Sequence, residues 1–219
     1  MPMRLPPVST LVEIHDLHHR FADNAVLSSV DLTVAAGEVV GISGPNGSGK
    51  TTLLRILARL VRPVAGTGKI LGRDLDEWPS PDRRGVGLVT HRPALIGELT
   101  IEENLKHTAR LCGIDPGSVF KALRVVGLET VTSRRGDECS FGMKRRVEVA
   151  RLLLTKPTLL LLDEAAGGLD EAAAGLIDAL IARTSGEGGA VVIVSHDSHW
   201  LSGRAGRLFR LENGELGAP

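Results

Sequence analysis

The sequence predicts an α/β fold around a mainly parallel sheet, with antiparallel strands near its N-terminus and an inserted block of helices. The apolar runs at 159–162 and 191–194 have the length and composition of strands buried on both faces of a parallel sheet. A third run, 39–43, leads into a glycine-rich loop and then an amphipathic helical segment. The 219 residues are enough for one such domain with a sizeable core.

The N-terminal part is expected to form antiparallel strands. Apolar and polar residues alternate over 11–42, with turn residues at Asp23-Asn24 and Ala36-Gly37. Residues 1–10 contain prolines and one arginine but no apolar run, so we expect a loose leader and not a signal peptide. Residues 11–219 are expected to form a single domain, because no internal repeat is evident.

Residues 92–156 are expected to form an inserted helical subdomain, because they lack long apolar strands. Helical patterns cover 101–111 and 119–126. A last helix is expected to start near Gly142 and to stop at Lys156-Pro157, since proline cannot continue a helix. Farther along the chain, residues 171–184 have the pattern of an amphipathic helix between two buried strands.

The glycine-rich loop is the most informative motif of the chain. It fits the phosphate-binding loop pattern with Gly44, Pro45, Asn46, Gly47, Ser48, Gly49, Lys50, Thr51 and Thr52. Glycines let successive backbone N–H groups point at a polyphosphate, and the following helix adds the partial positive charge of its N-terminus. Lys50 is expected to reach the β- and γ-phosphates, and the Thr51 hydroxyl to bind Mg²⁺. A chance match is the alternative, and the position between a strand and a helix argues against it.

Polar residues end the two buried strands, at the edge where ligands of open α/β sheets bind. Asp163 is expected to hold Mg²⁺ through water, and Glu164 to accept a proton from the attacking water. Acidic residues at this place are often helix N-caps, an interpretation that the phosphate-binding loop disfavours. His196 follows the other strand and is expected to reach the γ-phosphate and orient the water, although a histidine there is often only structural.

With these motifs in order, the chain resembles the ATP-binding cassette (ABC) ATPases over about residues 11–214. The resemblance implies a P-loop NTPase core with ATP and Mg²⁺ as cofactors. It implies that Phe21 stacks on adenine and that Asp170 lies in the loop after the catalytic glutamate. It also implies that Ser140 and Gly142 contact the γ-phosphate of an opposite subunit. The partners are then a second copy or a related cassette, together with separate membrane subunits at the cytoplasmic face of the membrane.

The chain departs from the family pattern in the signature segment, which usually reads Leu-Ser-Gly-Gly-Gln. Cys139, Phe141 and Met143 replace its first, third and fifth residues, while Ser140 and Gly142 are kept. Phosphate contact between subunits is therefore retained as an expectation. The altered signature also motivates an alternative function, a nucleotide-gated binding module that closes but hydrolyses little ATP.

Two further departures lie near the expected catalytic residues. Ala165 replaces the usual proline after Glu164, and His91 replaces the usual glutamine at the junction with the helical subdomain. A histidine there is similar to the ATP-binding subunit of the haem exporter of cytochrome c maturation. A neutral substitution in another exporter is the alternative. How Mg²⁺ and the attacking water are placed beside His91 stays open.

Composition excludes several other functions. Lys plus Arg and Asp plus Glu number 26 each, so no bulk charge favours nucleic acid. No apolar run approaches the roughly 20 residues of a membrane helix, and the two cysteines fit a reducing cytosol. An ATPase of repair or translation predicts tandem cassettes, a long coiled coil or a basic face, and a GTPase predicts an Asn-Lys-x-Asp motif. None of these features is visible in the sequence.

Overall fold

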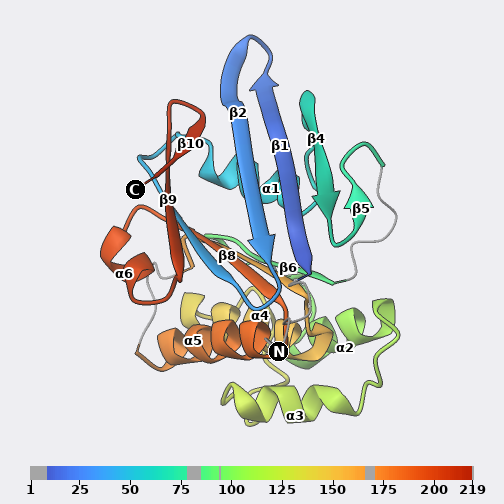
Figure 1. The fold of residues 1–219 in the computed structure, drawn as a ribbon. Coiled ribbons are helices and arrows are strands. Elements are labelled where there is room, and N and C mark those ends of the chain that lie inside the picture. The colour runs from blue at the N-terminus through green and yellow to red at the C-terminus, as the bar shows by residue number, and fades with distance from the viewer. Residues whose placement is uncertain (1–8, 78–84, 94, 166–170, 219) are drawn as a thin grey trace, which may run out of the picture.

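The structure, a computed structural model, describes residues 9–77, 85–93, 95–165 and 171–218. Over these residues the chain forms a mixed α/β fold in layers. An antiparallel sheet lies at the top of Figure 1, a second sheet crosses the middle, and several helices lie below it. The predicted fold class is confirmed.

The antiparallel sheet begins with the long hairpin predicted from residue alternation. Its strands are β1 (Thr10–Phe21), β2 (Asn24–Ala35), β4 (Ala65–Ile70) and β5 (Arg73–Asp74), in the spatial order β2-β1-β4-β5. The strands β4 and β5 were not predicted. They are short, and the glycines and exposed residues of β4 leave no alternation to recognise.

The second sheet is parallel except at one edge. Its spatial order is β10-β9-β3-β8-β7-β6, and only the β9–β10 pair is antiparallel. The strands are β3 (Val39–Ser43), β6 (Val86–Val89), β7 (Leu159–Asp163), β8 (Ala190–Ser195), β9 (Arg207–Glu212) and β10 (Glu215–Gly217). The carboxyl ends of β3, β8 and β7 therefore meet at one edge.

The helices α1 to α5 lie close to the predicted helical segments, whereas α6 was not predicted. They are α1 (Lys50–Leu57), α2 (Ile101–Leu111), α3 (Ser118–Val125), α4 (Phe141–Thr155), α5 (Glu171–Gly186) and α6 (Ser198–Ser202). Thr100 and Glu103 form a reciprocal capping box at the start of α2. Lys156 ends α4 in the left-handed conformation just before Pro157. The helices α2, α3 and α4 fall inside the expected insertion.

The central sheet separates two apolar cores. Alternate residues of a strand point to opposite faces, and every residue of β7 is buried because both faces are covered. Leu159 and Leu161 face the core shared with α1 and the antiparallel sheet, whereas Leu160 and Leu162 face the helices α4 and α5. The leucine run of β7 is unbroken because other elements of the protein cover both faces of the strand.

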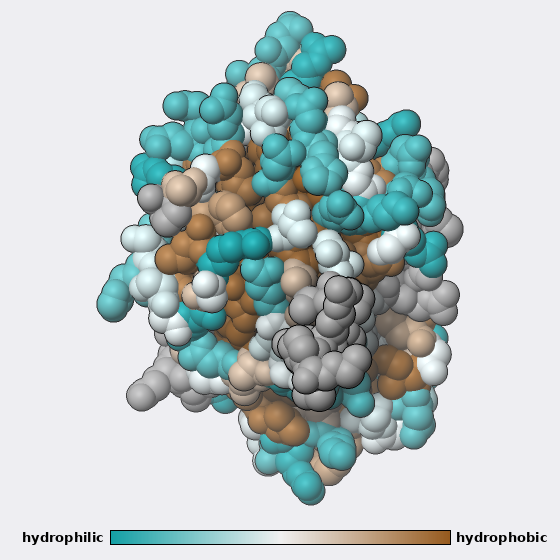
Figure 2. Space-filling view, in the orientation of Figure 1, coloured by the Kyte–Doolittle hydropathy of each residue, from teal (hydrophilic) through white to brown (hydrophobic). Residues whose placement is uncertain are grey.

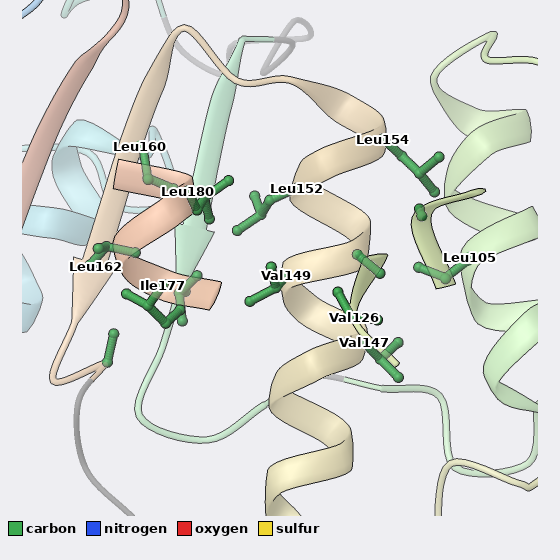
Figure 3. Close-up of a cluster of buried hydrophobic side chains, with 14 of the residues drawn as sticks. Leu105, Val126, Val147, Val149, Leu152, Leu154, Leu160, Leu162, Ile177 and Leu180 are labelled. Atoms are coloured by element: carbon green, nitrogen blue, oxygen red, sulfur yellow. The ribbon is translucent and has the colours of Figure 1, made fainter. Parts of the chain in front are cut away.

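The helix α4 lies between the sheet and the other helices. In Figure 3, Val149 and Leu152 point toward β7 and α5, whereas Val147 and Leu154 point toward α2 and α3. Because α4 has apolar residues on two sides, it packs on the sheet with one side and on the other helices with the other. It therefore links the sheet to α2 and α3.

Polar and apolar residues both lie on the face that Figure 2 shows. Hydrophilic residues dominate the edges of the face in Figure 2, and apolar residues gather across its middle. Within the described part of the chain, no helix has the length and apolarity needed to span a membrane.

The close contact between β4 and β1 requires a glycine at position 68. A Cβ at Gly68 would clash with the Glu13 carbonyl oxygen and lie 2.7 Å from the Ile14 Cα, at a φ of +148°. We expect Gly68→Ala to lower the free energy of unfolding by about 3 kcal/mol, through strand separation and backbone strain. Gly72→Ala is the control, since its φ is +76° but no heavy atom lies within 4 Å of the new Cβ. Equal losses in denaturant unfolding for both variants would refute the prediction.

Candidate active site

The glycine-rich loop connects the end of β3 to the start of α1, as predicted. Gly44, Gly47 and Gly49 have φ values of +156°, +83° and +102°, and at the last two L side chains are rare. A Cβ at Gly44 would overlap the Leu211 carbonyl oxygen, and one at Gly49 would lie 2.8 Å from the Val26 carbonyl oxygen. Glycine is therefore needed both for the curvature of the loop and for its close approach to neighbouring backbone.

Lys50 opens α1 and is 6% exposed. Its Nζ donates to the carbonyl oxygens of Gly44 and Pro45, each at 2.8 Å. Burial lowers the pKa of Lys50, and the nearby carboxylates of Glu164 and Asp163 act in the opposite direction. The ammonium group thus lies inside the curve of the loop, where phosphate oxygens can replace the two carbonyls as acceptors.

The loop also contains a buried hydroxyl that suits a ligand. The Oγ of Ser48 is buried and has no hydrogen-bond partner among the described residues. Buried polar groups in native structures are normally paired, so an unpaired one in this loop fits a site that receives phosphate oxygens.

Thr51 and Asp163 are brought together from α1 and β7. The Thr51 hydroxyl donates to Asp163 Oδ1 at 3.1 Å, and Asp163 is 5% exposed. Burial raises the pKa of Asp163 and the Glu164 charge adds to this, whereas the Thr51 hydrogen bond lowers it. A carboxylate and a hydroxyl oxygen are donors that Mg²⁺ prefers, so this pair fits the predicted metal position.

Glu164 is fixed by three hydrogen-bonding groups at the end of β8. Its backbone is in the left-handed region, with a φ of +48°. Oε1 accepts from the His196 N–H at 2.8 Å, and Oε2 accepts from the Ser195 hydroxyl at 3.0 Å. The His196 ring Nδ1 also lies 3.0 Å from Oε2. The structure therefore brings the two predicted residues together and adds Ser195, which the sequence did not single out.

Several of these residues line one cleft of about 250 Å³. Its lining consists of Phe21, Val26, Asn46, Gly47, Gly49, Lys50, Thr51, Thr52, Asp163 and Glu164. Phe21 ends β1, is 51% exposed, and meets the His19 ring edge-on at 4.7 Å between centroids. An exposed aromatic face beside a phosphate-binding loop suits a flat nucleotide base. Val26, from β2, is a lining residue that the sequence did not reveal.

The other predicted residues are absent from this lining, including Gly44, Pro45, Ser48 and His196 described above. His91 follows β6 and is exposed, and its carbonyl accepts from Arg145 at 3.3 Å. Ser140 caps α4 by accepting from the Met143 N–H at 3.2 Å, and Gly142 lies in the first turn of that helix. Neither Ser140 nor Gly142 lines the cleft of the phosphate-binding loop. Asp170 lies outside the described residues.

Residues 27–167 match the ABC transporter family. The lantibiotic transport ATP-binding protein SrtF of Streptococcus pyogenes is 31% identical, over 85% of this chain and 80% of that protein. The sulfate/thiosulfate import ATP-binding protein CysA of Mycobacterium tuberculosis is 36% identical over 95% of this chain. This chain spans 61% of the length of that second relative.

Two solved structures are similar throughout. One, an ATP-binding subunit of an ABC transporter, has a TM-score of 0.87 and 29% identity, covering 95% of this chain and 90% of that one. The other is a dimeric ATP-binding cassette in a post-hydrolysis state, bound to ADP and Pi. Its TM-score is 0.83 and its identity 26%, covering 94% of this chain and 96% of that one.

The two adjacent carboxylates are expected to affect stability in opposite directions. Burial raises the pKa of Asp163, so its contribution to stability is present at low pH and is lost as the pH rises through that pKa. Asp163→Asn removes the buried charge and keeps an acceptor for Thr51. We expect it to raise the melting temperature of the nucleotide-free protein at pH 7 by about 3 °C, or about 1 kcal/mol.

Glu164→Gln is the matched variant, because it removes a charge that accepts hydrogen bonds from Ser195, at the end of β8, and from His196 after it. We expect this variant to lose about 1 kcal/mol, since hydrogen bonds to an ionised acceptor are stronger than those to an amide. Thermal unfolding of both variants at pH 7 checks the contrast. A shift of the same sign in both would contradict this account of the site.

Proposed function

Because this chain belongs to the ABC transporter family of ATPases, we propose that it is the ATP-hydrolysing subunit of a transporter, acting through nucleotide-driven closure of a two-cassette dimer. The observation that carries the proposal is one cleft lined by a phosphate-binding loop and two carboxylates, of which Glu164 is bound by His196. In this proposal residues 11–219 act as one ABC ATPase domain, with residues 92–156 as its helical insertion.

The chemistry of the site is mainly positioning and charge neutralisation. Lys50 binds the β- and γ-phosphoryl oxygens in place of its present carbonyl acceptors. Mg²⁺, when held near Thr51 and Asp163, supplies neutralisation of phosphate charge. Glu164 accepts a proton from the attacking water, and His196 holds the carboxylate in place from the neighbouring strand.

The second half of each site comes from another cassette in this proposal. Ser140 is exposed at the start of α4, and the partly buried Gly142 follows it in the first turn. A hydroxyl and a backbone N–H at a helix N-terminus favour a phosphate group. The similar solved structure bound to ADP and Pi is dimeric, which supports the pairing of two cassettes. The partner is a second copy or a related cassette, and separate membrane subunits hold the pair at the cytoplasmic face of the membrane.

A finer proposal concerns the cargo. His91 occupies the junction after β6 where the family usually has glutamine, and this feature supports a haem exporter of cytochrome c maturation. The relatives named above carry other cargo by their descriptions, a lantibiotic and sulfate or thiosulfate. The cargo proposal therefore depends on His91 and needs its own test.

Glu164→Gln tests hydrolysis against simple nucleotide-gated closure. The variant keeps the Lys50, Thr51 and Asp163 contacts while removing the base, so Mg-ATP should accumulate as a trapped dimer and ATP turnover should fall about 100-fold or more. Sedimentation with and without Mg-ATP measures the dimer. Lys50→Ala should neither dimerise nor hydrolyse, and Lys69→Ala, on exposed β4, should behave as wild type. If the wild type dimerises as persistently as Glu164→Gln and neither hydrolyses, the binding-module function is correct.

The cargo proposal predicts a response to haem. The chain purified together with its membrane subunits should hydrolyse ATP severalfold faster when haem is added, because cargo binding favours the closed dimer. Metal-free protoporphyrin is the matched control, since it keeps the ring but not the iron. A complex that hydrolyses ATP but does not respond to haem would exclude haem as cargo and leave the ATPase function intact.

A further inference from the structure

Arg145 is a charged residue buried completely in the first half of α4. Its Nη1 donates to the Thr90 carbonyl at 2.8 Å and to Glu148 Oε2 at 2.7 Å. Its Nη2 donates to the His91 carbonyl at 3.3 Å. One guanidinium therefore joins α4 to the main chain of the loop that follows β6.

The same side chain also contacts the start of α4. The Arg145 guanidinium carbon lies 5.6 Å from the centre of the Phe141 ring, within the range of a cation–π interaction. Phe141 is the first residue of α4 and is 38% exposed. The buried Arg145 guanidinium therefore contacts both the exposed Phe141 ring and the loop of Thr90 and His91.

A second arginine shows that this link differs from ordinary anchoring of the helix. Arg151, farther along α4, donates to the Leu88 carbonyl at 3.1 Å. Leu88 lies inside β6 and is therefore part of the sheet, whereas Thr90 and His91 lie beyond the end of that strand. Arg151 holds α4 to the rigid sheet, and Arg145 holds it to the loop.

We propose that Arg145 is a positioning residue that ties the start of α4 to the loop of Thr90 and His91, so that nucleotide contact at one is transmitted to the other. The inference rests on the proposed closure of two cassettes, in which the start of α4 meets the nucleotide of the partner. A planar guanidinium suits the task, because its fixed fork binds several acceptors at once and fixes their relative position.

The guanidinium of Arg145 has acceptors on both the loop and α4. Two of them are main-chain carbonyls, so the contact sets the path of the backbone regardless of the side chains at these two positions. Glu148, three residues along α4 and 2% exposed, holds the guanidinium from its own helix. Since interiors are close-packed, a shift of the start of α4 must move the loop or break these bonds.

The test separates positioning from stability. Arg145→Met alone breaks the 2.7 Å ion pair with the buried Glu148, and this variant is expected to unfold more easily. The double variant Arg145→Met/Glu148→Met removes both charges at similar volume, a replacement that proteins often tolerate. Arg145→Lys keeps the charge but not the fork, and Arg151→Met is the matched control that removes an arginine–carbonyl contact from the same helix.

The measurements are the kcat and KM for ATP of the full chain with its membrane subunits, and hydrogen exchange of the full chain with and without a non-hydrolysable ATP analogue. We expect the double variant to lose about tenfold in kcat, with KM within about twofold of wild type. The analogue should still protect residues 44–52, but should no longer protect residues 86–92. Arg145→Lys should be intermediate, and Arg151→Met should keep protection of both segments.

Two results would overturn the inference. One is a double variant with wild-type kcat and with protection of residues 86–92 by the analogue. The other is an equal loss of protection in Arg151→Met, which would assign the effect to general loosening of α4. If the wild type does not hydrolyse ATP, the proposed function fails, while the exchange comparison still decides whether Arg145 links α4 to the loop.

Discussion

The parallel pairing of β3 with β8 and of β8 with β7 is the constraint on which the site depends. Ser43 is in register with Ser195, and Asp163 with Val194, so the three strands end at almost the same level. Each parallel strand must return through a crossover, and the residues after each carboxyl end are therefore free to form a ligand-binding edge. The phosphate-binding loop, the two carboxylates and His196 meet there because the strands do, although more than 140 residues separate Lys50 from His196.

Charged groups are buried at this edge of the sheet, which costs desolvation free energy. Hydrogen bonds within the protein offset part of that cost. Lys50 and Asp163 are both almost fully buried, and burial shifts the pKa of each toward its neutral form. Backbone carbonyls satisfy the ammonium, and Thr51 satisfies one carboxylate oxygen. A polyphosphate with a divalent cation provides stronger partners for the same groups. These buried charges are thus stabilised more by a bound ligand than by the contacts of the free protein.

The position of α4 connects this chemistry to the rest of the protein. Its apolar residues pack on the sheet from one side and on α2 and α3 from the other (Figure 3). Its arginines extend the same role to polar groups, since Arg151 holds β6 and Arg145 holds the loop beyond it. Movement of the helices relative to the sheet must therefore involve α4.

Local sequence by itself determined much of the fold and most of the candidate site. Glycine spacing, unbroken apolar strands and terminal carboxylates depend on backbone sterics and on neighbours along the chain, so the loop, β7, β8 and the capped helix α2 were predicted with nearly correct bounds. We could assign Asp163, Glu164 and His196 to one edge of the sheet, because each of them lies at or just after the carboxyl end of a predicted parallel strand.

Only the tertiary structure decided which distant groups hold these residues in place. Ser195 binds Glu164, Val26 lines the cleft, and Arg145 joins α4 to backbone carbonyls some 55 residues away. None of these contacts has a sequence pattern, because a hydrogen bond to a carbonyl requires only a donor at the right place and any residue supplies the acceptor. The strands β4 and β5 were missed for a related reason, since pairing with β1 and not their own composition makes them strands.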